Sequence, residues 1–186
     1  MTHGPPASLS TTETETLKST LNHQVDRFTL DGQSFTAKVT NVYDADTCQV
    51  VFYLKDRLVR YSLRLKGIDT PEMRPSMKKP NRELEKKAAK RSRNRLIQLV
   101  TNSEIKLDNT CGPKKCQQIV DKNTMLVTLQ CHEFDKYGRL LGSLYPDNSA
   151  PKSTQTGGNS LSANKILIDE GFAYEYHGGT KKNWTF

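Results

Sequence analysis

Hydrophobic and polar residues alternate along three consecutive segments in the first part of the chain, at residues 34–43, 47–54 and 58–65. These segments are rich in Val, Thr, Phe, Tyr and Leu, and a period of two residues is typical of a strand with one buried face. The polar residues 55–57 separate the second segment from the third and predict a turn. The pattern therefore predicts three consecutive strands that form a meander.

A helical period replaces this alternation at residues 80–102. Pro80 and the potential N-cap residue Asn81 mark the start of this helix. Its apolar stripe is predicted to consist of Leu84, Ala88, Leu96, Leu99 and Val100. A second helix is predicted at residues 160–171, with serine near its start and Gly171 at its C-terminal cap.

The remaining apolar segments, residues 103–108 and 124–134, predict a fourth and a fifth strand, and residues 139–145 can extend the sheet. Residues 109–123 and 146–160 are rich in Gly, Pro, Lys, Ser and Thr, so we expect loops there. Five strands, with one helix after the third and another at the end, suit an α+β, mainly β, fold. We expect a five-stranded OB-fold β-barrel with flanking helices.

The two ends of the chain differ from this pattern. Residues 1–25 are polar and rich in Thr and Ser, so we expect a poorly ordered N-terminal arm, with at most a short helix within residues 15–28. One domain, residues 26–180, and a basic C-terminal tail, residues 181–186, make up the rest. The sequence has neither a long apolar run nor a start that resembles a secretory signal. We expect an intracellular protein without membrane contact, and secretion stays open if a leader was trimmed from this chain.

The charge balance is basic, with 28 Lys and Arg against 20 Asp and Glu and a net charge of +8. A basic surface suits an anionic partner such as nucleic acid, a membrane surface or an acidic protein, but does not choose among them. Six basic residues cluster on the helix at 80–102. A solvated helix face is the favoured interpretation of this cluster, ahead of a nucleic-acid-binding surface or a nuclear-import signal. These residues are Lys86, Lys87, Lys90, Arg91, Arg93 and Arg95.

Four cysteines, Cys48, Cys111, Cys116 and Cys131, leave three possibilities open. Free thiols are favoured because the setting is expected to be intracellular. A local disulfide between Cys111 and Cys116 is the next alternative. A zinc site that joins this pair to Cys131 and His132 is the third, although the spacing is wider than in the usual zinc knuckle.

Candidate chemistry concentrates in three short polar clusters, which are residues 44–47, 64–72 and 135–139. Each cluster by itself also fits an ordinary turn or capped loop. Together they contain the groups that phosphodiester hydrolysis requires. Carboxylate and carbonyl oxygens bind a hard cation such as Ca²⁺ or Mg²⁺, the forked donors of arginine hold a phosphate, and a further carboxylate can position or deprotonate a water molecule.

The order and spacing of these clusters resemble the staphylococcal nuclease, or thermonuclease, family. The resemblance extends from about Phe35 to Tyr176. It is carried by the strings DADT at 44–47, RLKGIDTPE at 64–72, DKYGR at 135–139 and SANKILIDEGFA at 162–173. The resemblance implies an OB-type barrel with flanking helices. It also implies a calcium-dependent endonuclease that cleaves DNA and RNA with little sequence preference and leaves 3′-phosphate ends.

The resemblance further implies roles for individual residues. The metal ligands of the family fall on Asp46, Asp69 and the backbone carbonyl of Thr70. Its two phosphate-clamping arginines fall on Arg64 and Arg139. Its essential glutamate, usually given the role of general base, falls on Glu72, and Asp44 fits a supporting acidic position.

The substrate-binding positions of the family fall on Lys136 and Tyr137. Tyr176 is the candidate that closes the nucleotide pocket, with Tyr174 or His177 as alternatives. One departure from the family pattern is Ala45, which replaces the usual glycine of the first cluster. If that glycine has a positive φ, Ala45 distorts the approach of the neighbouring aspartate.

The implied substrates are DNA and RNA, with single strands preferred because their bases can stack on Tyr137. The alternative is a non-catalytic nuclease-like barrel that binds RNA, single-stranded DNA or a protein partner. Such a module is expected to lose the acidic and arginine groups, whereas this chain keeps them. The sequence indicates no obligate protein partner.

Overall fold

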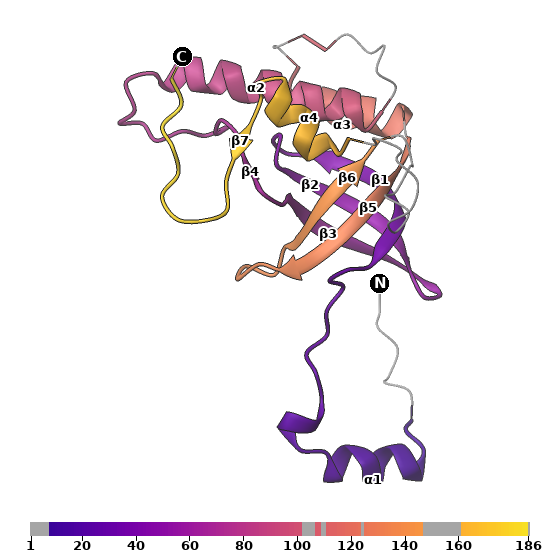
Figure 1. The fold of residues 1–186 in the computed structure, drawn as a ribbon. Helices are drawn as coiled ribbons and strands as arrows, with labels where there is room; N and C mark the ends of the chain where they lie inside the picture. The colour runs from indigo at the N-terminus through magenta and orange to yellow at the C-terminus, as the bar shows by residue number, and fades with distance from the viewer. Residues whose placement is uncertain (1–7, 102–106, 109–110, 124, 147–160, 186) are drawn as a thin grey trace.

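A closed barrel of five strands forms the centre of the protein in the computed structural model, which describes residues 8–101, 107–108, 111–123, 125–146 and 161–185 (Figure 1). The strands are β1 (Ser34–Val42), β2 (Thr47–Leu54), β3 (Arg57–Leu65), β5 (Leu126–Phe134) and β6 (Leu140–Tyr145). Their order around the barrel is β1-β2-β3-β6-β5. β3 and β6 pair in parallel, and the other neighbouring strands are antiparallel. The predicted meander and the predicted barrel are confirmed.

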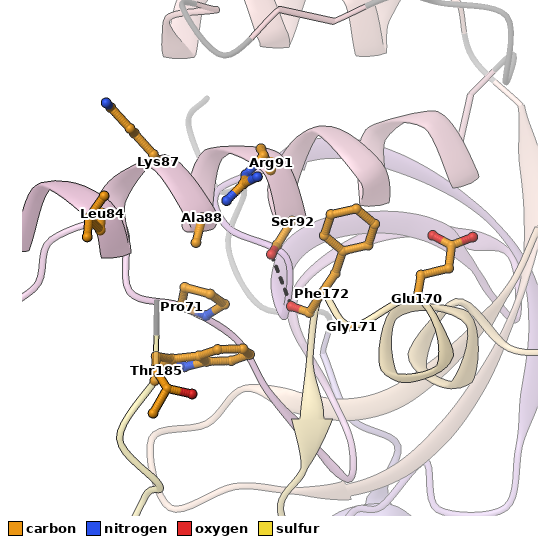
Figure 2. Close-up of a pocket in the computed structure, with 11 residues that line it drawn as sticks. Pro71, Leu84, Lys87, Ala88, Arg91, Ser92, Glu170, Gly171, Phe172 and Thr185 are labelled. Atoms are coloured by element: carbon orange, nitrogen blue, oxygen red, sulfur yellow. Dashed lines mark hydrogen bonds between the residues drawn. The ribbon is translucent and has the colours of Figure 1, made fainter. Parts of the chain in front are cut away.

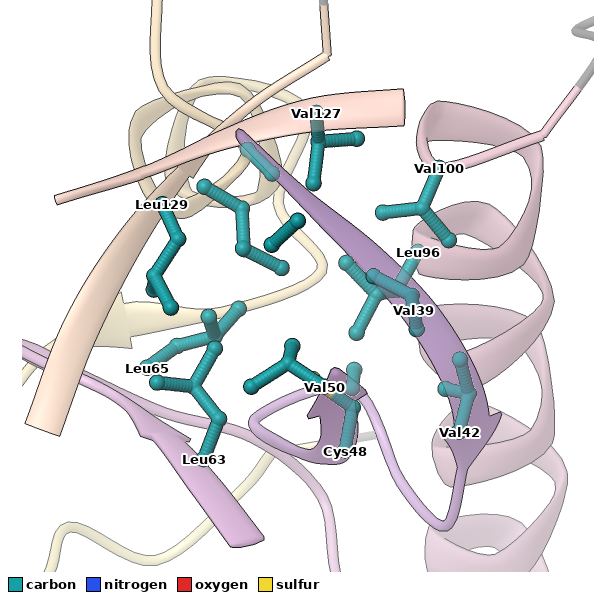
Figure 3. Close-up of a cluster of buried hydrophobic side chains, with 14 of the residues drawn as sticks. Val39, Val42, Cys48, Val50, Leu63, Leu65, Leu96, Val100, Val127 and Leu129 are labelled. Carbon is teal, nitrogen blue, oxygen red and sulfur yellow. The ribbon is translucent and has the colours of Figure 1, made fainter. Parts of the chain in front are cut away.

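The interior of the barrel is filled by the apolar residues that alternate along these strands (Figure 3). Val39 of β1, Val50 of β2, Leu63 and Leu65 of β3, and Leu129 of β5 are almost completely buried. Burial of one such side chain stabilises a fold by about 1.5–3 kcal/mol. The barrel is therefore a packed scaffold for the loops at its ends.

Gly142 of β6 lies where the strands approach most closely. A Cβ atom at this position would lie 2.8 Å from Leu63 Cδ1 and 3.0 Å from the carbonyl oxygen of Gln130. Real Cβ atoms do not approach backbone oxygens or packed side chains so closely. Glycine at this position therefore permits the parallel pairing of β6 with β3.

The helices α2 (Arg82–Leu99), α3 (Pro113–Lys122) and α4 (Ala163–Asp169) flank the barrel, together with a small sheet in which β4 (Ile68–Asp69) pairs with β7 (Tyr174–Glu175) (Figure 1). The N-terminal arm holds α1 (Thr11–Ser19) and a short 3-10 helix at Asn22–Gln24, and it extends away from the barrel. α3 packs on β1, whereas α4 contacts α2, β6 and β7. None of the described helices combines the length and the apolar character that crossing a bilayer requires.

The buried face of α2 differs from the predicted apolar stripe. Leu84 is 46% exposed, while Glu85, Ala89 and Leu96 are buried. Arg93, predicted to belong to the basic face, is also buried, and its guanidinium donates a 2.7 Å hydrogen bond to the carbonyl oxygen of Cys111. The predicted stripe is confirmed for Leu96 and Val100, which are buried, and wrong for Leu84. Polar and charged side chains with buried partners occupy part of the face that packs against the rest of the fold.

Two predictions in the middle of the chain need correction. The fourth strand expected at 103–108 falls mostly outside the described residues, and residues 107–108 are not in a strand. The place of this strand in the barrel is taken by β6. The loop expected at 109–123 contains α3, whose Pro113 occupies the first turn, where a missing N–H is harmless. Apart from Pro146, the loop expected at 146–160 lies outside the described residues.

The N-terminal arm contains a helix that begins earlier than the short helix considered at 15–28. α1 is capped by Ser10, whose side chain accepts from the backbone N–H of Glu13, and none of its residues is buried. Contact with the barrel begins further along the chain, where the rings of Phe28 and Phe134 lie 6.3 Å apart and Leu30 is fully buried. The residues ahead of Asp26 therefore add no described side chain to the core.

The four cysteines are free and buried. The Sγ atoms of Cys111 and Cys116 lie 2.7 Å apart. Within the described ranges, the side chains of these two residues do not gather with Cys131 and His132 into a metal-binding group. The structure therefore favours free thiols over the zinc alternative.

Candidate active site

The three polar clusters meet at one end of the barrel. The turn between β1 and β2, the segment after β3 and the turn between β5 and β6 surround a cavity of about 400 Å³. The cavity is lined by Asp44, Asp46, Thr47, Arg64, Thr70, Glu72, Lys136, Tyr137, Arg139, Tyr176 and Lys181. Asp69 does not line this cavity but is bonded to residues that do. The structure thus brings together residues that lie far apart in the sequence.

Asp46 is buried at the start of β2 and its carboxylate is held by two hydroxyl groups. Thr47 Oγ1 donates to Asp46 Oδ1 at 2.9 Å, and Thr70 Oγ1 donates to Oδ2 at 3.0 Å. Ala45 is buried and does not have a positive φ. Alanine in place of the usual glycine at this position therefore causes no backbone strain.

Asp44 lies beside the Asp46 carboxylate, which affects the pKa of Asp44. Burial, together with repulsion from Asp46, raises the pKa of Asp44 to about 8. Asp44 is therefore largely protonated at neutral pH, and a positive charge brought close to it would favour its ionised form.

Arg64 extends from β3 between two carboxylates. Its Nη1 lies 2.9 Å from Asp46 Oδ2, and its Nη2 lies 3.3 Å from Asp69 Oδ1. Nη2 also donates a 2.9 Å hydrogen bond to the carbonyl oxygen of Ile68. The planar guanidinium thus fixes the relative positions of both aspartates, a task that a lysine side chain cannot perform with the same geometry.

Asp69 is held from its other side by a residue of the C-terminal region. β4 pairs with β7 so that Asp69 is opposite Tyr174. Tyr174 Oη donates a 2.8 Å hydrogen bond to Asp69 Oδ2. Burial, together with this hydrogen bond and the negative charge of Asp69, raises the pKa of Tyr174 to about 12. The tyrosine therefore stays protonated and keeps donating at neutral pH.

Lys181 places a positive charge between two carboxylates of the site. Its Nζ lies 3.0 Å from Asp69 Oδ1 and 2.7 Å from Glu72 Oε1. Burial lowers the pKa of Lys181, but the hydrogen bonds to Glu72 and Asp69 outweigh this effect and raise the pKa above its usual value. The oxygens at this position therefore bind a cation, here the ammonium group of a side chain.

Glu72 is positioned through its backbone by a buried carboxylate of α2. Its N–H donates a 3.4 Å hydrogen bond to Glu85 Oε1, and Lys79 Nζ contacts both oxygens of Glu85 at 2.9 and 3.0 Å. Glu85 is almost completely buried, whereas the side chain of Glu72 is 47% exposed. The Glu72 carboxylate is therefore accessible to water while its backbone is anchored.

The turn after β5 presents Arg139 from a rigid base. Asp135 Oδ1 accepts from the backbone N–H groups of Tyr137 and Arg139 at 2.8 and 2.9 Å. Asp135 Oδ2 accepts from Arg139 Nε at 2.7 Å. Burial raises the pKa of Asp135, but the hydrogen bonds from Arg139 and Tyr137 outweigh it and leave the pKa below its usual value. Arg139 is therefore held in place by Asp135 through both its backbone N–H and its guanidinium group.

A second cavity of about 500 Å³ adjoins the first and is suited to a flat ring. Tyr137, which is exposed, lines it together with Tyr176 and His177. Lys136 Nζ lies 5.0 Å from the centre of the Tyr137 ring. Tyr174, one of the two alternatives to Tyr176, does not line this cavity and contacts Asp69 instead. Tyr176 and His177 thus remain the candidates for closing a nucleotide pocket.

Several residues of the site were not singled out from the sequence. They are Lys181, Glu85, Lys79 and the hydroxyl of Thr70, and Tyr174 appeared only as an alternative for another role. Glu85 carried one detectable signal, because the residues one helical turn after it, Ala88 and Ala89, are apolar. Lys181 carried none, because it belongs to a short basic tail that resembles a solvated segment.

A comparison with protein families supports the resemblance found in the motifs. Residues 62–184 match the model of the family described as staphylococcal nuclease homologues, which is more than half of the chain. The match contains Arg64, Asp69, Glu72 and Arg139 and begins after Asp46. No curated protein matches the chain. On the basis of the family match and the closed barrel, the chain belongs to the family of staphylococcal nuclease homologues.

Proposed function

We propose that the protein is a calcium-dependent endonuclease that hydrolyses phosphodiester bonds of DNA and RNA, prefers single strands and leaves 3′-phosphate ends. The family to which the chain belongs is generally one of nucleic-acid hydrolases. The observation that supports activity in this chain is the shared cavity, which gathers Asp46, Arg64, Glu72 and Arg139. A barrel that only bound nucleic acid would have no need for this combination.

The donor set fits a hard cation. Asp46 and Asp69 each lie within hydrogen-bond distance of Arg64, and Asp69 also binds the Lys181 ammonium, so these oxygens already attract positive charge. Asp46, Asp69 and the carbonyl of Thr70 would hold the ion. When bound, Ca²⁺ would supply positive charge that stabilises a phosphate oxygen and orients water.

The remaining chemistry falls to the side chains. Glu72, accessible and anchored through Glu85, accepts a proton from the attacking water as its oxygen bonds to phosphorus. Arg64 and Arg139 stabilise the charge that develops on the phosphoryl oxygens. The bond between phosphorus and the 5′-oxygen breaks, and that oxygen takes a proton from solvent. The products are one strand with a 3′-phosphate and one with a 5′-hydroxyl.

Calcium is expected to support faster cleavage than magnesium. The protein supplies few ligands, which leaves several positions to water, and Ca²⁺ accepts such an irregular shell more readily than Mg²⁺ does. The test incubates plasmid DNA and total RNA with the protein in Ca²⁺, in Mg²⁺ or with a chelator. Cleavage in Mg²⁺ that equals or exceeds cleavage in Ca²⁺ contradicts this part of the proposal. Binding without cleavage under every metal contradicts the proposal as a whole and favours the non-catalytic module.

A further inference from the structure

A third cavity, of about 610 Å³, lies outside the candidate active site, between α2 and the C-terminal residues (Figure 2). A volume of this size is typical of ligand-binding pockets. It is lined by Pro71, Leu84, Lys87, Ala88, Arg91, Ser92, Glu170, Gly171, Phe172, Trp184 and Thr185. Figure 2 shows Ala88 directed from α2 toward Pro71, with Thr185 on the opposite side of the groove. We refer to this cavity as the α2 groove.

The surface of the α2 groove combines apolar and aromatic groups that a globular core would normally cover. Leu84, which the sequence assigned to the buried stripe, is instead 46% exposed and lines the groove. Trp184 is half-buried, and its indole packs against the ring of Tyr174 with the centroids 5.1 Å apart. An indole supported in this way is a suitable surface on which a base can stack.

The rim of the groove is basic. Lys87 and Arg91 are one helical turn apart on α2, and both are exposed. Neither forms an ion pair within the described part of the chain. The acidic residue of the groove, Glu170, is held by Arg95 through two contacts of 2.6 Å. The rim therefore offers two positive charges to a phosphate backbone, with the local carboxylate already neutralised.

The groove and the candidate active site are lined by neighbouring residues of the chain. Pro71, which lines the groove, stands between Thr70 and Glu72, which line the active-site cavity. Tyr174 connects the two on the other side, since its ring packs on Trp184 while its hydroxyl donates to Asp69. A strand that passes the site beside Glu72 therefore meets the groove within a short distance.

We propose that the α2 groove binds a further nucleotide of a single-stranded substrate, with a base stacked on Trp184 and phosphates held by Lys87 and Arg91. This inference rests on the proposed nuclease function and extends it, because it makes a strand longer than a dinucleotide the preferred substrate. The aromatic surface, the basic rim and the link to the active site through Pro71 and Tyr174 each favour a nucleic acid over an uncharged ligand. Loss of one stacked base weakens single-strand binding by about tenfold or more.

The test compares oligonucleotides that fill the active site alone with ones that also reach the groove. The proteins carry Glu72→Gln so that the strands stay intact in Ca²⁺, and fluorescein-labelled dT2 and dT8 are the probes. Trp184 is the only tryptophan of the chain, so its fluorescence reports directly on the groove. The double substitution Lys87→Glu with Arg91→Glu replaces the two positive charges of the rim with negative ones. Its matched control is Lys114→Glu with Lys115→Glu, which makes the same change of charge on exposed residues of α3.

We expect dT8, but not dT2, to quench Trp184 fluorescence. We also expect the Lys87 and Arg91 double variant to bind dT8 at least about tenfold more weakly than the control variant does, with dT2 affinity alike in the two. Thermal melting checks that both variants fold.

Three results overturn the inference. Equal weakening by the two double variants would show that the rim acts only through general charge. Absence of quenching by dT8 despite tight binding would place the strand elsewhere. A Trp184 signal that changes on dilution of the protein alone would identify a second copy of the chain as the occupant. If neither oligonucleotide binds at all, the proposed function fails together with the inference, so the two failures can be told apart.

Discussion

Lys181 is expected to compete with the metal ion for the acidic oxygens of the site. Its ammonium group contacts Asp69, whose side chain is 3% exposed, and Glu72, whose side chain is 47% exposed. The substitution Lys181→Met keeps most of the length and the apolar stem of the side chain but removes its charge. A cation that binds to this variant no longer has to displace the ammonium group.

The size of the effect follows from these two contacts. A hydrogen bond between charged groups contributes about 1.5–3 kcal/mol, and an exposed ion pair about 0–1 kcal/mol. Because the Lys181 side chain is itself 49% exposed, solvent screening keeps the sum near the low end of the first range. A contribution of about 1.4 kcal/mol corresponds to a tenfold change in an equilibrium constant. We therefore expect Lys181→Met to bind Ca²⁺ about tenfold more tightly than the unsubstituted chain.

Isothermal titration with Ca²⁺ at neutral pH measures this difference. The matched control is Lys182→Met, because Lys182 carries the same charge on the next residue and its Nζ lies 5.7 Å from the centre of the Tyr174 ring. Its substitution changes the overall field by the same amount without touching the acid pair. If the two variants bind Ca²⁺ equally well, or if Lys181→Met binds it more weakly, Lys181 does not occupy the position of the cation and the reasoning is wrong.

Four further predictions concern activity and stability. A chain that begins at Asp26 should keep its melting temperature and its cleavage rate, since α1 has no buried residue; a loss of either would show that the arm packs on the domain or on substrate. Arg139→Lys should lower the cleavage rate by about 100- to 1,000-fold, because lysine cannot form two parallel hydrogen bonds to a phosphoryl group. A similar loss in Lys136→Ala would point to general electrostatic attraction instead. Gly142→Ala should lower the free energy of unfolding in urea by about 1–3 kcal/mol through overpacking, and an unchanged midpoint would refute the close approach of β6. The pKa of Asp135 is lowered in the folded state, so its carboxylate stabilises the fold above about pH 4, and this contribution is lost as the pH falls below that value. The loss of unfolding free energy caused by Asp135→Asn, measured by urea titration, should therefore become smaller in acid. A loss that becomes larger in acid would contradict this sign.

Local sequence patterns were sufficient for the first half of the barrel. β1, β2 and β3 follow one another with short turns, so the alternation of buried and exposed residues determines both the strands and their pairing. β6 was harder, because its parallel pairing with β3 joins segments far apart in the sequence. α3 was missed because Gly, Pro and Lys dominate its surroundings. One signal for this helix was present but not used: Cys116 and Val120, which are both buried, are spaced one helical turn apart.

For the site, too, local motifs could be recognised from the sequence, whereas contacts between distant segments could not. The motif residues Asp46, Arg64 and Arg139 could be grouped as one candidate site because short, specific strings carry the family resemblance, and the structure places them around one cavity. Tyr174 and Lys181 could not be assigned their contacts, since these depend on how the C-terminal segment returns past β4. A hydrogen bond across such a distance in sequence leaves no periodicity or spacing to detect.

Hydrolysis itself is measured by incubating a labelled single-stranded oligonucleotide with excess protein in Ca²⁺, beside Glu72→Gln purified in the same way. The proposed function predicts rapid cleavage by the unsubstituted protein, no cleavage when a chelator is present, and a rate at least about 100-fold lower for Glu72→Gln. The new ends should carry 3′-phosphates, so a polymerase extends them only after phosphatase treatment. Equal cleavage by the two proteins would point to a contaminating nuclease or a different base, and intact oligonucleotide with the unsubstituted protein in Ca²⁺ would contradict the proposed function.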